Sequence, residues 1–320
     1  MIKYSLYGNT EVWHNLVNDS LINQVAHAYL FTGPVGIGKA TTAKEYIKYL
    51  LSANEVLAKR IDEGNFLDLL YICKQDKNEI SIDMIRKARD FFKQTPAEGE
   101  KKFVIIDSAD DLNLNAANAL LKILEEPSKN TYLFLISHTP NTLLATIRSR
   151  ARLIKFKPIS PKELKLIANM SKALELEDFV AGSAARAIMI EESDVISIYT
   201  KLLELLQSND ILAFNKIAEQ LIKQHWQLIT QLLEYLISRL IKISAGCSLN
   251  LSEIEQEILI PLATKKTLEE WFFIRDDILK SISQAEIYNL DKKQVLLFSL
   301  EKIRLQITLT AFSKSSTNFT

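Results

Sequence analysis

The residues best suited to chemistry form a glycine-rich segment near the N-terminus. Gly33, Gly36, Gly38 and Lys39 lie in a stretch that reads G-x-x-x-x-G-K, the spacing of a phosphate-binding P-loop. Glycines permit tight turns whose N–H groups point inward, and the start of a following helix adds partial positive charge. Lys39 would add a full charge. The segment predicts a phosphate-binding site, with a simple tight turn between a strand and a helix as the alternative.

The hydroxyl that should ligate magnesium is missing from this segment. In a working P-loop ATPase the residue after the lysine is Ser or Thr. Here it is Ala40, and Thr41 and Thr42 lie roughly 100° and 200° further round a helix of about 3.6 residues per turn. The pattern therefore predicts the fold of a P-loop protein and argues against hydrolysis by this chain.

A second apolar run ends in a carboxylate. The stretch 103–106 precedes Asp107, as in strands that present an aspartate to Mg²⁺. Ser108 follows, where ATPases of this kind have a glutamate that polarises the attacking water, and a hydroxyl is too weak a base for that task. Asp107 could equally cap the next turn, and both interpretations stay open. His138 is expected to be a polar residue at a strand end, not a catalyst.

Basic residues gather further along the chain without an acid among them: Arg148, Arg150, Arg152, Lys155 and Lys157. Such a run can be a solvated face, which is the commoner case, or an anion-binding edge. An arginine is suited to completing a phosphate site in a neighbouring subunit, because its permanently charged guanidinium binds two oxygens. Lys101 and Lys102 could meet DNA phosphates, and we expect them instead to be solvated.

The elements that position these residues divide the chain. An amphipathic helix is expected over residues 10–25. Apolar runs at 28–32, 69–72, 103–106 and 132–136, separated by helical patterns, predict an α/β domain over residues 1–158. Ser160 and Glu163 form a capping box after Pro158, and three short helical patterns follow over about 162–192. Gly182-Ser183 breaks two of these patterns, and Ser183 can cap the next helix. Residues 195–320 read as one helix after another, with breaks expected at 208–210, 245–246, Pro261 and Asn289.

Composition narrows the class of protein. The 320 residues are 48% apolar and 24% charged, as in ordinary soluble proteins, and the net charge of zero gives no global footprint for nucleic acid. Cys73 and Cys247 make neither a disulfide framework nor a four-ligand zinc site. The N-terminus is no signal peptide, and no apolar stretch approaches about 18 residues, so we expect a cytoplasmic protein without a membrane partner.

Five stretches together resemble one family: HAYLFTGPVGIGKAT, FVIIDSAD, NAANALLKILEEP, LLATIRSRAR and AEIYNLDKKQVLL. They are similar to the AAA+ proteins of clamp loaders, and most to the delta-prime (δ′) subunits of the bacterial DNA polymerase III clamp loader. The helix that ends Leu124-Glu125-Glu126-Pro127, followed by Ser149-Arg150, points to clamp loaders. The missing ATPase residues point to δ′.

The resemblance implies an α/β P-loop (AAA+) domain over 1–158, a small helical lid over 159–194 and an all-helical collar over 195–320 through which five subunits form a ring. It implies a stator that hydrolyses no ATP and whose Arg150 acts in trans on a neighbour's ATP. Ala151 stands where the family motif has a cysteine. In ATP-hydrolysing relatives the lid carries an arginine over the γ-phosphate, and here Arg186 comes one residue late.

The implied partners are the γ/τ and δ subunits, the sliding clamp transiently, and primed DNA through the assembled complex. The P-loop backbone and Lys39 could still hold ATP, but no cofactor is required. Many relatives have four cysteines of a zinc module before the second strand motif; Cys73 is the one cysteine there, so we predict no zinc or other metal. Two alternatives remain: an autonomous P-loop ATPase or ATP-hydrolysing clamp-loader-like subunit, and a helical scaffold with a vestigial P-loop.

Overall fold

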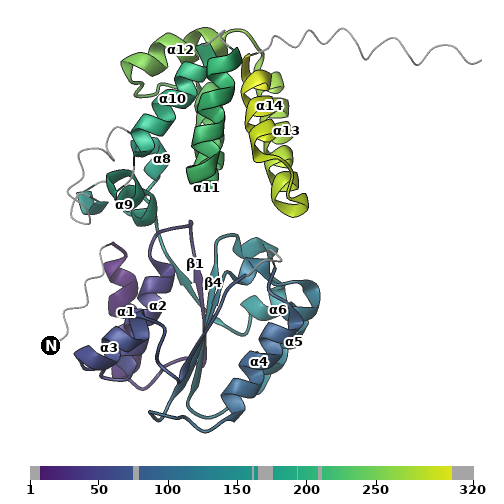
Figure 1. Cartoon of the computed structure of the whole chain (residues 1–320). Helices are drawn as coiled ribbons and strands as arrows, with labels where there is room; N and C mark the ends of the chain where they lie inside the picture. Colours follow the sequence, from purple (N-terminus) through teal and green to yellow (C-terminus); the bar gives the residue numbers. More distant parts are fainter. Residues whose placement is uncertain are drawn as a thin grey trace, which may run out of the picture. The chain divides into compact units, whose positions relative to one another are not determined.

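The computed structural model describes residues 8–74, 79–160, 162–164, 176–192, 194–207 and 211–304. The chain divides into two compact units, Met1–Glu191 and Glu192–Thr320 (Figure 1). The predicted division into three domains stays a prediction. Among the described residues, every helix is too short or too polar to cross a membrane.

The first unit is an α/β fold whose elements alternate along the chain. Its elements are α1 (Thr10–Leu21), β1 (Ala28–Thr32), α2 (Lys39–Leu50), α3 (Glu55–Asp62), β2 (Leu69–Ile72), α4 (Ile82–Lys93), β3 (Lys102–Asp107), α5 (Leu114–Glu125), β4 (Thr131–Ser137), α6 (Ala145–Arg148), β5 (Arg152–Lys155), α8 (Glu177–Val180) and α9 (Ala184–Glu192). The P-loop α/β class predicted from the sequence is confirmed.

The five strands form one parallel sheet in the order β2-β3-β4-β1-β5. Helices α1, α2 and α3 cover one face, and α4, α5 and α6 cover the other (Figure 1). Because strand side chains alternate between faces, Tyr29 and Phe31 pack toward the first layer and Leu30 toward the second. Tyr29 stacks on Phe134 of the neighbouring strand with ring centroids 5.5 Å apart. This double layer buries β1 completely and fixes the loop that follows it.

Two local expectations need correction. The helix predicted over residues 10–25 ends at Leu21, and Asn23 adopts a left-handed conformation with φ of 55°. The apolar pattern continued past the helix because Val25 still packs against the core. Strand β5, which begins at Arg152, lay inside the basic segment, where the charged residues at both of its ends, Arg152 and Lys155, concealed the strand pattern.

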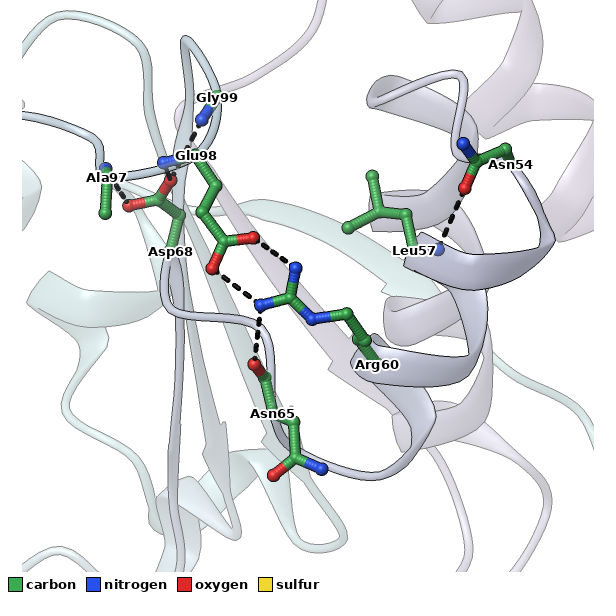
Figure 2. Close-up of polar contacts among 8 residues, drawn as sticks. All are labelled: Asn54, Leu57, Arg60, Asn65, Asp68, Ala97, Glu98 and Gly99. Atoms are coloured by element: carbon green, nitrogen blue, oxygen red, sulfur yellow. Dashed lines mark hydrogen bonds and ion pairs between the residues drawn. The ribbon is translucent and has the colours of Figure 1, made fainter.

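Lys101 and Lys102 are not solvated, contrary to the expectation. Lys101 donates to the carbonyl of Leu50 at 2.9 Å. Lys102 is 3% exposed and lies 3.4 Å from the carboxylate of Asp68. Figure 2 shows Asp68 accepting hydrogen bonds from the backbone N–H groups of Ala97, Glu98 and Gly99. The two lysines therefore stabilise the start of β3 through contacts within the chain and do not form a surface for DNA.

Helix α9 begins after a glycine turn, as predicted. Gly182 has φ of 74°, and an added Cβ would lie 2.6 Å from Pro158. The Ser183 hydroxyl accepts a hydrogen bond from the Arg186 N–H at 3.3 Å. Because the carbonyl of Gly182 accepts from the N–H of Ile159 at 3.0 Å, this turn is attached to the segment that leaves the sheet.

The second unit is helical throughout its described part. Its helices are α10 (Val195–Gln207), α11 (Ile211–Ser244), α12 (Glu253–Ala263), α13 (Leu268–Tyr288) and α14 (Lys292–Arg304). The break predicted at Pro261 is wrong: the proline lies inside α12, which continues past it to Ala263. The predicted break at 208–210 lies outside the described residues. A buried ion pair between Arg239 and Glu255, 2.8 Å apart, joins α11 to α12.

Candidate functional site

The glycine-rich loop joins the carboxyl end of β1 to the first residue of α2. Gly33, Gly36 and Gly38 have φ of 142°, 77° and 90°, which other residues rarely adopt. An added Cβ on Gly33 would lie 2.6 Å from the carbonyl oxygen of Phe156. The four P-loop residues predicted from the sequence thus lie in one tight loop at a helix N-terminus, where backbone N–H groups and the helix dipole attract anions.

Lys39 is 3% exposed, and its ammonium group is bonded within its own chain. It donates to the carbonyl oxygens of Gly33 at 2.5 Å and Pro34 at 2.6 Å, and it lies 2.8 Å from Nδ1 of His138. Burial lowers the pKa of Lys39 to about 8, against the opposing influence of two nearby carboxylates. Burial and the Lys39 charge lower the pKa of His138, so the neutral imidazole can accept a hydrogen bond from the Lys39 ammonium group. These three contacts engage the Lys39 ammonium group, which a bound phosphate would need as its partner.

A cavity of about 350 Å³ lies between this loop and α9. It is lined by residues of the loop, the strand ends and α9: Val35, Gly36, Gly38, Lys39, Ala40, Thr41, Asp107, Ile136, His138, Ala184, Ala185 and Ile188. The loop and α9 are in close contact, because an added Cβ on Gly36 would lie 2.2 Å from the Ser183 hydroxyl. The α9 wall consists of small and apolar side chains. Arg186 instead donates to the carbonyl of Phe179 at 3.0 Å.

The position at which a P-loop ATPase has a magnesium-binding hydroxyl carries no side-chain oxygen in this chain. Ala40 lines the cavity, and the buried Thr42 donates its hydroxyl to the Gly38 carbonyl at 2.9 Å. Asp107 also lines the cavity, but it accepts a hydrogen bond from the phenol of Tyr71 at 2.5 Å. Burial and the neighbouring carboxylate raise the pKa of Tyr71, so the phenol remains a donor.

Asp110, and not Asp107, holds the turn at the end of the sheet. Its carboxylate accepts from the hydroxyls of Ser108 and Ser137 and from the N–H of His138. Burial alone would raise the pKa of Asp110, but these hydrogen bonds lower it below its usual range. Asp110 therefore fixes the backbone that carries His138 toward Lys39. Sequence reasoning missed Asp110, whose one signal is its place three residues beyond the strand-end aspartate.

Arg150 lies outside the cavity, just beyond the end of α6. Its side chain is 38% exposed, and Nη2 lies 2.9 Å from Oε1 of Glu125, whose side chain is 48% exposed. Nη1 donates to the Thr146 carbonyl at 3.2 Å and to the Ser149 hydroxyl at 3.4 Å. Ala151 is buried in the core beneath it. The structure thus presents this guanidinium at the surface and gives it a carboxylate partner that sequence reasoning missed.

The rest of the basic segment does not act as one surface. Arg152 lies 2.7 Å from Asp19, and Lys157 lies 3.9 Å from Glu11, so both are paired with α1. Arg148 is exposed. Cys73 and Cys247 are free and exposed, and within the described residues no group of three or more His, Cys, Asp and Glu side chains could hold a metal ion.

A parallel five-stranded sheet with a glycine loop between the interior strand β1 and α2, followed by a helical segment against that loop, is the architecture of an AAA+ P-loop protein. The fold resembles the crystal structure of a DNA polymerase III, gamma subunit-related protein from Thermotoga maritima, with a TM-score of 0.52, 19% identity, and coverage of 91% of this chain and 99% of that one.

Residues 8–160 match the family described as "DNA polymerase III, delta subunit". The chain is 35% identical over 205 residues to DNA polymerase III subunit delta' of Bacillus subtilis, covering 55% of this chain and 62% of the relative. It is 42% identical over 137 residues to the Pseudomonas aeruginosa subunit delta', covering 40% and 42%. Through this α/β region, the chain is similar to the delta-prime subunits of DNA polymerase III. The matches span 62% and 42% of the length of these two relatives.

Proposed function

We propose that this chain is a clamp-loader subunit of DNA polymerase III that hydrolyses no ATP itself and contributes Arg150 to the ATP site of a neighbouring subunit. The family match over the α/β region supports its place in the polymerase assembly. The activity and the partners of the whole chain are part of the proposal, because the matched relatives extend beyond the aligned region.

One observation carries the proposal: the P-loop lysine is bonded to its own loop. Lys39 has three partners within the chain, and a nucleotide would have to displace them. Ala40 offers no hydroxyl to a metal, and the carboxylate of Asp107 already accepts a hydrogen bond from Tyr71. These residues do not fit a magnesium nucleotide. We therefore assign this chain no intrinsic ATPase and no required cofactor.

Arg150 supplies a positive charge for the ATP site of a neighbouring subunit. Its guanidinium is exposed at the end of a short helix, which is where a second subunit could approach it. An arginine placed on a transferring phosphoryl group from outside the ATP-holding subunit can accelerate hydrolysis by about 10³–10⁵. The proposed partners are therefore the ATP-hydrolysing γ/τ subunits and δ. Contact with the sliding clamp and primed DNA would come through the assembled complex.

Nucleotide binding and turnover test the proposal together. The purified chain should bind ATP weakly or not at all by calorimetry, with or without Mg²⁺, and should release no phosphate. The chain reconstituted with γ/τ and δ should support DNA-stimulated hydrolysis that falls when Arg150→Ala is introduced. Brisk turnover by the isolated chain that Lys39→Ala abolishes would instead support the autonomous ATPase.

A further inference from the structure

We propose that Glu125 holds Arg150 in a resting contact in the free subunit, and that a neighbour's nucleotide phosphates displace this carboxylate when they engage the arginine. The inference rests on the proposed trans role of Arg150 and names how that role is restrained. Glu125 acts on the neighbour's site through Arg150, so it is a positioning residue.

Glu125 occupies a place that its own helix disfavours. It is the last residue of α5, where unsatisfied carbonyl groups carry partial negative charge. A second acid, Glu126, follows at the C-cap. Carboxylates are unfavourable there, and residues that break a local preference tend to be functional or compensated elsewhere. The compensation for Glu125 is the Arg150 guanidinium at 2.9 Å.

The backbones that carry the two side chains are held by the core. Leu124 is 3% exposed, and its carbonyl oxygen lies 3.2 Å from Nε2 of His27. On the other side, Ile147 and Ala151 are buried in the same apolar cluster as Leu124. Because α5 and α6 share this cluster, exchange of the arginine's partner needs a change of side-chain rotamer and no movement of the helices.

The contact is suited to being exchanged. Both side chains are partly exposed, at 38% and 48%, and ion pairs of this kind are weak because water screens them. A triphosphate carries more negative charge than one carboxylate and accepts two N–H groups of a guanidinium at once. Nη1 keeps its bond to the Thr146 carbonyl as a pivot, so the planar group stays oriented while Nη2 changes partner.

The test compares Glu125→Gln with Glu126→Gln in the loader reconstituted from the full chains. Both variants remove one negative charge from the same helix end, and within the described residues Glu126 has no ion pair with Arg150. Glu125→Gln should lower the KM for ATP by up to about fivefold, the scale of an exposed ion pair, and leave kcat unchanged. Glu126→Gln should leave both constants unchanged. The Glu125→Gln effect should shrink as salt is raised.

Repeating Glu125→Gln in the Arg150→Ala background separates the two proposals. The KM effect should vanish there, because the carboxylate has no arginine left to hold. If Arg150→Ala leaves turnover unchanged, the trans role itself fails. If Arg150→Ala impairs turnover but Glu125→Gln behaves like Glu126→Gln, or raises KM, the trans role stands and the resting contact is overturned. A Glu125→Gln effect that persists without Arg150 would also overturn it.

Discussion

The ammonium group of Lys39 lies 2.8 Å from Nδ1 of His138, at the carboxyl edge of the sheet where a phosphate would otherwise be held. The imidazole is carried to this position by β4 and by the Asp110 carboxylate, which accepts from the His138 N–H. A lysine that should meet a ligand is thus enclosed by its own loop and by the neighbouring strand. The P-loop keeps its backbone conformation, while the Lys39 ammonium group bonds to residues of its own chain.

This enclosure predicts a pH dependence for the α/β unit. Lys39 has a pKa of about 8 in the folded chain, below its ordinary 10.5, because burial disfavours the charged form. Between these values the unfolded chain binds more protons than the folded one, so the Lys39 contribution to stability rises with pH. Relative to Lys39→Met, the wild-type unfolding free energy should increase by up to about 3 kcal/mol between pH ~8 and ~10.5.

Equilibrium denaturant unfolding across that pH range measures the difference. Lys129→Met is the control, because Lys129 is exposed and its replacement removes the same charge away from the P-loop. A difference between wild type and Lys39→Met that stays flat, or falls with pH, would show that the ammonium group is not held in a desolvated site.

Tyr71→Phe should destabilise the α/β unit by about 0.5–1.5 kcal/mol, the net contribution of one hydrogen bond. The phenol donates to Asp107 at 2.5 Å, and the variant leaves that carboxylate in the cavity without this donor. The loss should appear as a lower denaturant midpoint near neutral pH. Tyr132→Phe, in the same sheet, is the matched control and should cost less, because no hydrogen bond of the Tyr132 hydroxyl is found within the described residues. Equal losses for the two variants would contradict the Tyr71–Asp107 contact.

Asp68→Asn should be among the most damaging single changes, at about 3–5 kcal/mol, because it leaves Lys102 buried without its counter-charge. Burial tends to raise the pKa of Asp68. The N–H groups of Ala97 and Glu98 and the Lys102 charge outweigh this effect, so the net result is a lowered pKa. A lowered carboxylate pKa gives stability that is present above about pH 4 and is lost as pH falls through the folded value.

Acid unfolding therefore distinguishes Asp68 from an exposed aspartate. Wild type and Asp83→Asn, whose carboxylate is 74% exposed, should unfold at similar acid midpoints. Asp68→Asn should unfold at higher pH or be unfolded throughout, and hydrogen exchange at 97–99 should quicken in a folded sample. Unchanged protection of those three amides would mean that the carboxylate is not what holds the loop shown in Figure 2.

The sequence predicted the elements whose signals are local. The G-x-x-x-x-G-K spacing and the apolar run before it placed β1, the loop and α2, and Gly182 with Ser183 placed the start of α9. Pro261 misled because α12 continues through the proline to Ala263, and β5 was missed because its exposed residues do not read as a strand.

Contacts between distant segments could not be predicted in the same way. Lys102 is separated from Asp68 by a helix and a loop, and parallel pairing of β2 with β3 is what brings them together. The same pairing sets Tyr71 beside Ile105 and so within reach of Asp107. Glu125 meets Arg150 because α5 and α6 share one core. Each pair follows from sheet register or helix packing, which the chemistry of either residue alone does not reveal.

The most direct measurement is single-turnover ATP hydrolysis by the loader reconstituted with γ/τ and δ, comparing Arg150→Ala with Arg148→Ala. Arg148 is also exposed and is the last residue of the short helix that precedes Arg150, and its replacement removes the same charge. The account predicts that Arg150→Ala slows hydrolysis at the adjacent site by about 10³-fold or more, while Arg148→Ala leaves it within a few-fold of wild type. Equal rates for the two variants would contradict it.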